Sequence, residues 1–171
     1  VLASDNDGGP GNGAYISGYT IPTSGTYYVV VGHYWGASGG YHLRVDLARG
    51  MQMETDREYN NDSMGNADRL TLGYTGGHLK ATVAGTIMAA QRWAQTDEDI
   101  FHWGQINAGC TVELVLTTPS SSTLLPKVSL LASDGTPVAD TDPSDTRFLG
   151  TMPADDVYYA KVESPHWWAH S

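Results

Sequence analysis

The chain is poor in cysteine, in basic residues and in long apolar runs, and each shortage excludes a class of protein. A single cysteine, Cys110, among 171 residues excludes an intrachain disulfide. Nine Lys and Arg residues against 19 acidic ones give a formal net charge of -10, and no basic cluster could neutralise nucleic-acid phosphates or an anionic membrane. No apolar run has the length of a transmembrane helix. We therefore expect no nucleic-acid partner and no membrane partner.

Catalytic motifs are also missing. The sequence contains neither an HExxH nor a GxSxG pattern, and no histidine partner marks any serine as a nucleophile. His166 and His170 are four residues apart, but they lie in an expected loop beside two tryptophans and not in a zinc-like motif. We therefore predict a chain without enzymatic activity.

What the chain does contain is a series of short runs rich in β-branched and aromatic residues, separated by turn signals such as Gly76-Gly77 and Asp134-Gly135. Such a series is typical of an all-β protein, and we predict a jelly-roll-like antiparallel β-sandwich. A short helical turn is expected at residues 64–68. The predicted strands are 14–20, 26–32, 41–47, 70–72, 80–87, 99–103, 111–117, 127–131, 147–150 and 157–162.

An internal repeat sets the domain organisation. Residues 21–31 reappear, at an offset of 131, as residues 152–162, and the acidic stretch 3–7 corresponds to 138–142. A period this long indicates tandem domains. We expect residues 1–48 to be the C-terminal part of a first β-sandwich repeat, residues 49–66 to be an acidic linker, and residues 67–171 to be a second β-sandwich repeat that lacks its last strand, the counterpart of residues 41–47.

Two acidic clusters precede predicted strands. Residues 54, 56, 58 and 60 carry oxygen donors, and in an extended segment they project to one side. Asp97 and Asp99 would also face the same way. Such groups repel each other unless something compensates, and Ca²⁺ binds six to eight oxygen ligands. Solvation of a charged surface is the alternative.

The order of the motifs resembles the bacterial pre-peptidase C-terminal domain and the related collagen-binding domains of clostridial collagenases. The resemblance covers residues 52–171, with the tail of a second copy in residues 1–48. It implies a non-catalytic, often calcium-binding jelly-roll sandwich appended to secreted bacterial enzymes. The motifs are the acid-x-acid-x-Asn run ending in Asp62-Ser63, Ala84-Gly85-Thr86-Ile87, Asp97-x-Asp99, Ala108-Gly109-x-Thr111-Val112, Leu130-x-x-Ser133-Asp134-Gly135-Thr136 and the Tyr158-Tyr159 strand.

Carried over residue by residue, the resemblance implies a set of calcium ligands in the linker and at Asp97 and Asp99. Tyr59 stands where the family commonly has proline, and an extra Asn61 leaves open whether Asn60 or Asn61 is the ligand. Glu54 lies one step outside the pattern and is a weaker candidate. The expected linker ligands are Asp56, Glu58, Asn60 or Asn61, and Asp62.

Aromatic residues occupy the same expected loop in both copies, as Tyr34 and Trp35 in the first and Trp167 and Trp168 in the second. Exposed aromatic rings there could stack on sugars or grip a polypeptide. We therefore expect a binding site for an extracellular polymer, either a protein fibre or a polysaccharide. The alternative is that these rings cover the edge of the sandwich or pack against a neighbouring domain.

These observations predict a calcium-binding accessory module of a secreted or cell-surface bacterial protein, used for substrate attachment, spacing or secretion support. The alternative is a structural or adhesive repeat of an extracellular surface protein or fibre. In that case residues 41–47 would complete a neighbouring copy by donor-strand addition, giving head-to-tail self-assembly.

Overall fold

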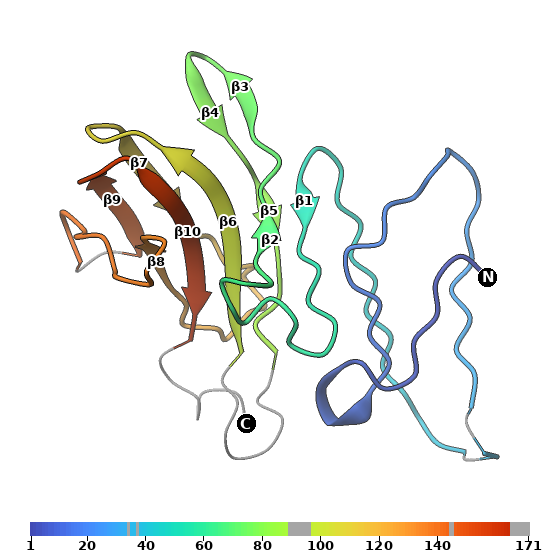
Figure 1. The fold of residues 1–171 in the computed structure, drawn as a ribbon. Coiled ribbons are helices and arrows are strands. Elements are labelled where there is room, and N and C mark those ends of the chain that lie inside the picture. Colours follow the sequence, from blue (N-terminus) through green and yellow to red (C-terminus); the bar gives the residue numbers. More distant parts are fainter. Residues whose placement is uncertain (34, 37, 89–96, 144–145, 165–171) are drawn as a thin grey trace.

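The structure is a computed structural model of the chain, and it describes residues 1–33, 35–36, 38–88, 97–143 and 146–164. The described residues contain short strands, one 3-10 segment, η1 (Pro10–Asn12), and no helix that could cross a membrane (Figure 1). The strands are β1 (Gln52–Met53), β2 (Asp68–Arg69), β3 (Gly73–Thr75), β4 (His78–Lys80), β5 (Val83–Ala84), β6 (Glu98–Ile106), β7 (Thr111–Val115), β8 (Lys127–Leu131), β9 (Arg147–Thr151) and β10 (Asp156–Glu163).

Two sheets enclose the core. The larger sheet has the order β2-β6-β10-β8, with β10 antiparallel to both of its neighbours and β2 parallel to β6. The smaller sheet is the antiparallel pair β7-β9. The prediction of an all-β sandwich is therefore confirmed, whereas the jelly-roll connectivity stays a prediction. The core residues come from both sheets and the turn after β9: Phe101, Val112, Leu114, Leu130, Phe148, Met152, Tyr158 and Ala160.

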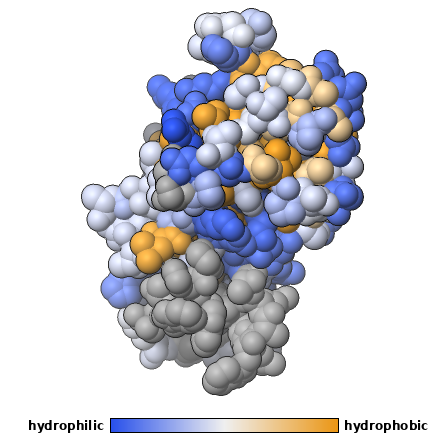
Figure 2. Space-filling view, turned by 90° about the vertical axis from the view of Figure 1, so that its left-hand side faces the viewer, coloured by the Kyte–Doolittle hydropathy of each residue, from blue (hydrophilic) through white to orange (hydrophobic). Residues whose placement is uncertain are grey.

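The sequence pattern explains why these segments form strands. In β7 the apolar Val112 and Leu114 are buried, and the residues on either side of them are exposed. In β10, Tyr158 and Ala160 are buried at the same period of two. Burial of such apolar surface stabilises the sandwich by roughly 25 cal/mol per Å². Figure 2 shows the side of the molecule that bears β9, where apolar patches are separated by polar residues.

Smaller strand pairs connect the linker to the sandwich. The parallel pair β1-β5 is extended by a hydrogen bond from the Glu54 amide to the Ala84 carbonyl oxygen (3.0 Å). The hairpin β3-β4 turns at Gly76 and Gly77, whose positive φ angles of 59° and 85° suit glycine. The parallel pair β1-β5 therefore fixes residues 52–54 of the acidic linker beside residues 82–84.

From residue 97 onward the predicted strands agree closely with the observed ones, but earlier boundaries need correction. Residues 70–72 lie between β2 and β3, and the predicted strand 80–87 is shortened to β5 after the end of β4. The expected helical turn at 64–68 is a single turn, closed by the Asn66 amide and the Ser63 carbonyl oxygen (3.0 Å), and β2 begins at Asp68. Pairing between distant strands decides these boundaries, and local propensity does not reveal it.

The strands predicted at 14–20, 26–32 and 41–47 are not observed in the part of the chain that the structure describes. Figure 1 shows this N-terminal segment as a trace without arrows beside the sandwich. Its apolar side chains are exposed, including Tyr28 (86%) and Val30 (87%). A strand requires a partner for its backbone groups, and no described segment pairs with these residues.

Candidate metal site

The linker is hydrogen-bonded to the start of β6. The Ile100 amide donates to the Asn61 carbonyl oxygen (3.1 Å), and the Glu98 amide donates to Asp62 Oδ1 (3.2 Å). These bonds place the side chains of the linker beside those of the strand entry. The two acidic clusters therefore converge, as the family resemblance implied.

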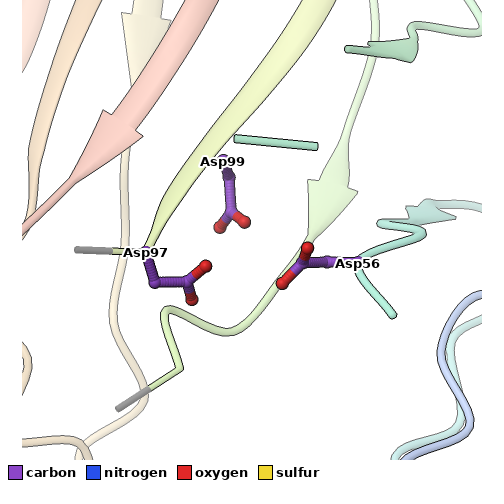
Figure 3. A group of neighbouring side chains, drawn as sticks. All are labelled: Asp56, Asp97 and Asp99. Atoms are coloured by element: carbon purple, nitrogen blue, oxygen red, sulfur yellow. The ribbon is translucent and has the colours of Figure 1, made fainter. Parts of the chain in front are cut away.

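Three carboxylates form the centre of the site. Asp56 comes from the linker, Asp97 immediately precedes β6, and Asp99 lies within it. Each offers one oxygen, and the three oxygens lie within 4.8 Å of one another. The side chains point toward a common centre (Figure 3), and the three residues are only 0%, 4% and 3% exposed. Calcium binds oxygen at about 2.3–2.6 Å, so ligands on opposite sides of the ion are about 5 Å apart, which fits this spacing.

Two further buried residues border the three aspartates. Glu54 is 1% exposed, and its Oε1 accepts a hydrogen bond from the Thr86 amide (2.6 Å). Its other carboxylate oxygen lies against Gly85, where any side chain would collide with it. Asn61 is fully buried, and its Nδ2 donates to Asp99 Oδ1 (3.3 Å). The donor set is thus composed of carboxylate and amide oxygens.

Four of these oxygens are buried without a hydrogen-bond partner: Glu54 Oε2, Asp56 Oδ2, Asn61 Oδ1 and Asp97 Oδ1. Nearly all buried polar atoms in folded proteins are satisfied, and an unsatisfied one costs about 1–3 kcal/mol, more when it is charged. Four orphaned oxygens within this buried acidic group are therefore the kind of donor that a positively charged ligand would satisfy.

The electrostatics of the cluster agree with this interpretation. Burial raises the pKa of Asp56 to about 6, and burial together with neighbouring carboxylates raises the pKa values of Glu54, Asp97 and Asp99. None of the ion pairs found among the described residues involves these four acids. Without a cation, the buried site favours protonated carboxyl groups over charged ones.

The structure separates the predicted ligands into two groups. Asp56, Asp97 and Asp99 are brought together, and Asn61 joins them whereas Asn60 is exposed. Glu58 also lies outside the cluster. It is exposed, has a positive φ of 59°, and pairs with Arg57 (3.3 Å).

Asp62 and Glu54 occupy the margins of the site. Asp62 is half-buried, and its Oδ1 accepts the hydrogen bond from the β6 amide of Glu98. Glu54 was a weaker candidate because it lies outside the family pattern, yet it is more deeply buried than Asp62. Its alternation with position 56 was the sequence signal that placed the two on one side.

Only one of the four predicted aromatic binding residues lies in the described part of the chain. Trp35 is 88% exposed and has a positive φ of 56°. Tyr34, Trp167 and Trp168 lie outside the described residues. Exposure of Trp35 is what a stacking residue requires.

The comparisons with known proteins add no relative. No protein-family model matches the chain, and neither the curated proteins nor the solved structures contain a match. The resemblance to pre-peptidase C-terminal domains therefore rests on the order of motifs alone.

Proposed function

We propose that this chain is a non-catalytic, calcium-binding β-sandwich module of a secreted bacterial protein. The observation that carries the proposal is the buried group of Asp56, Asp97 and Asp99 with orphaned oxygens around it. The motif order that resembles the pre-peptidase C-terminal domain supports the same function.

The donor chemistry favours calcium over other common protein metals. All candidate ligands present oxygen, which hard cations prefer, whereas zinc sites use cysteine and histidine. Magnesium demands a near-ideal octahedron and usually keeps several waters. A calcium ion would be held by Asp56, Asp97 and Asp99, with Glu54 and Asn61 as the neighbouring oxygen donors.

The contacts of the linker support a role in spacing neighbouring domains. Ser17 Oγ donates to the Glu54 carbonyl oxygen (2.8 Å), and the Tyr15 hydroxyl lies 3.4 Å from Glu54 Oε1. Arg57 forms an ion pair with Asp5 (3.0 Å). The same linker thus contacts the N-terminal segment on one side and the candidate metal site on the other. A bound cation would fix the linker and so limit the movement of the segment that precedes it.

Thermal unfolding tests the calcium proposal. The melting temperature of the intact chain should rise with free calcium and fall back with EDTA, because a ligand at 100 times its Kd stabilises the native state by about 2.7 kcal/mol. Asp99→Asn should abolish the calcium response and raise the melting temperature in EDTA at pH 8, since folding then no longer has to protonate or bury this carboxylate. Glu113→Gln, which changes an exposed acid paired with Arg147, is the matched control and should keep the response. A melting temperature of the intact chain that ignores calcium would overturn the proposal.

Attachment to an extracellular polymer is a second candidate function, favoured by the exposure of Trp35. The intact chain should be retained on insoluble collagen, chitin or cellulose, and Trp35→Ala should reduce that retention. Tyr28→Ala is the control, since Tyr28 is equally exposed but lies outside the aromatic loop. Equal retention of the chain and the Trp35 variant would exclude Trp35 as a binding residue.

A further inference from the structure

The two copies of the repeat share a local hydrogen bond. In the second copy, the Tyr158 hydroxyl donates to the Ala154 carbonyl oxygen (2.8 Å). In the first copy, the Tyr27 hydroxyl donates to the Thr23 carbonyl oxygen (2.6 Å). Both tyrosines reach back four residues, at the equivalent position of the repeat. The turn before the strand is therefore alike in the two copies.

An aspartate closes the preceding loop in both copies. Asp140 Oδ1 accepts hydrogen bonds from the amides of Asp142 and Leu149 (both 3.2 Å). Its counterpart Asp5 accepts with Oδ2 from the amides of Gly8 and Tyr15 (2.9 and 2.8 Å). In each case the carboxylate binds one amide in the loop and one beyond it. The two copies thus share two local hydrogen-bonding patterns, the tyrosine-to-carbonyl bond and the aspartate-to-amide bonds. In the first copy both patterns form without a sheet.

The surroundings of the two copies differ. Tyr158 and Ala160 are 1% and 7% exposed, because β10 lies between β6 and β8 and faces the core. Their counterparts Tyr27 and Val29 are 39% and 62% exposed. Val30, on the opposite side of the backbone, is 87% exposed. Residues 26–31 are therefore apolar on both faces and have no described strand beside them.

We propose that residues 26–31 are the β10-equivalent strand of a second β-sandwich, and that their partner is a pair of antiparallel strands arranged like β6 and β8. Tyr27 then occupies the core position of Tyr158, and Val29 that of Ala160. The turn and the loop before this strand already have the shape that β10 requires, so the docking segment is partly preorganised. The inference is independent of the calcium proposal.

Charge specifies the partner further. Residues 19–31 contain no charged side chain, and Val30 stands where the second copy has Lys161. Lys161 pairs with Glu98 of β6 (2.9 Å) and with Glu163 (2.8 Å). An acid at the Glu98 position, which lies diagonally across from the Val30 position in the β6-β10 register, would lose this cation. The partner strand should therefore carry an apolar or neutral residue there. A second copy of this chain does not supply the partner, because its β10 already fills the place between β6 and β8.

The first test supplies such a pair of strands within one chain. Residues 49–135 are fused ahead of Val1, because Val1 is the repeat counterpart of Thr136, and Glu98 in the added block is replaced by Val. Backbone amides of residues 26–31 should exchange hydrogen at least about 100-fold more slowly than in the original chain, in calcium and in EDTA alike. The same fusion with Tyr27→Asp should lose this protection. Unprotected amides in a folded fusion would overturn the proposal.

A second test places the sequence of residues 21–31 in the β10 position, between β6 and β8. It tests the proposal even if the fusion does not fold. Residues 152–162 are replaced by the sequence of residues 21–31, with Ala160 and Lys161 retained to keep the core volume and the ion pairs. This chimera should keep a cooperative thermal transition. A chimera shifted by one residue the other way, carrying the sequence of 20–30 with the same two residues retained, should lose it, because the slip moves Tyr27 to position 159 on the other face and puts Thr26 at the buried position 158. Loss of the transition in the in-register chimera, or equal stability of the two, would overturn the proposal. So would a dimer of the original chain that protects residues 26–31, since the partner would then be a second copy.

Discussion

Tyr27 and Tyr158 make the same hydrogen bond to a carbonyl oxygen four residues earlier, but one is 39% exposed and the other 1%. The chain around them has nearly the same sequence pattern, Ile-Pro-x-x-x-x-Tyr-Tyr in one copy and Met-Pro-x-x-x-x-Tyr-Tyr in the other. The comparison shows that the turn is specified by residues close in sequence. The strand that follows forms only where β6 and β8 are present to pair with it.

The largest expected difference between the two copies comes from truncating these tyrosines. Tyr158→Ala should destabilise the chain by about 3–5 kcal/mol, because it leaves a cavity in the core between the sheets. Tyr27→Ala should change the free energy of unfolding by less than about 0.5 kcal/mol, since its surroundings are open. Urea unfolding followed by tryptophan fluorescence measures both. Equal losses would show that residues 21–31 are packed in solution.

The pH dependence of the melting temperature should have opposite signs for the buried acidic cluster and for the N-terminal region. The pKa of Asp56 is raised by burial from 3.8 to about 6, so its protonation favours the folded state. In EDTA, the melting temperature should therefore rise as pH falls through about 6, and the gain should be complete below about 4. Asp56→Asn should weaken this rise.

Asp5, in the N-terminal region, should behave in the opposite way. Its pKa is lowered, chiefly by the hydrogen bond from the Tyr15 amide, so its contribution is present above the ordinary value of 3.8 and is lost as pH falls through the lowered one. Asp5→Asn should leave the rise near pH 6 intact and remove the loss at lower pH. A melting temperature in EDTA that does not change between pH 8 and pH 5 would contradict the prediction for the buried acidic cluster.

A smaller effect is expected from the tyrosine hydroxyl groups. Tyr158→Phe should cost about 0.5–1.5 kcal/mol, the usual worth of a hydrogen bond in a folded structure. Tyr27→Phe removes an equivalent bond from an exposed turn, where water can replace it, and should cost less than about 0.3 kcal/mol. Chemical unfolding of the two variants makes the comparison. A cost for Tyr27→Phe as large as that for Tyr158→Phe would mean that the first turn is as well enclosed as the second.

The smallest expected effects concern ion pairs. Lys161 is 18% exposed and bridges Glu98 and Glu163, so Lys161→Ala should cost about 1 kcal/mol. Arg44 and Asp46 pair at 2.7 Å, but their side chains are 70% and 52% exposed. Arg44→Ala should therefore be close to neutral, within about 0.3 kcal/mol, and insensitive to salt. Thermal unfolding at 0.05 and 0.5 M NaCl checks both values.

Much of the sandwich could be predicted because apolar and polar residues alternate along its strands. Val112 and Leu114 alternate with polar neighbours, and β8 was predicted with its observed bounds. The strands predicted in residues 14–47 are not formed in the described structure, for the opposite reason. Their composition favours strands, but strand formation depends on a partner that local sequence does not report.

The candidate site was predicted in part for a similar reason. Alternation placed Asp97 and Asp99 on one side of their segment and Glu54 and Asp56 on one side of the linker, because an extended chain directs every second side chain to the same side. That the two clusters share one site was implied by the family resemblance. The expectation of alternation failed at Glu58, where the backbone adopts φ of 59° and the alternation is broken. That turn carries Asn60 outward and brings Asn61 inward.

The sequence by itself determined the properties that depend on near neighbours: the strand periodicity, the turns of the repeat with their tyrosine hydrogen bonds, and the concentration of acids in two short segments. Only the tertiary structure decided which acids are buried together, because the amides of Glu98 and Ile100 fix the linker against β6 across about 40 residues of chain. It also decided which copy of the repeat becomes a strand. Backbone hydrogen bonds in a sheet join residues far apart in the chain, so the same local pattern forms a ladder beside β6 and β8 and remains exposed where no such strands lie next to it.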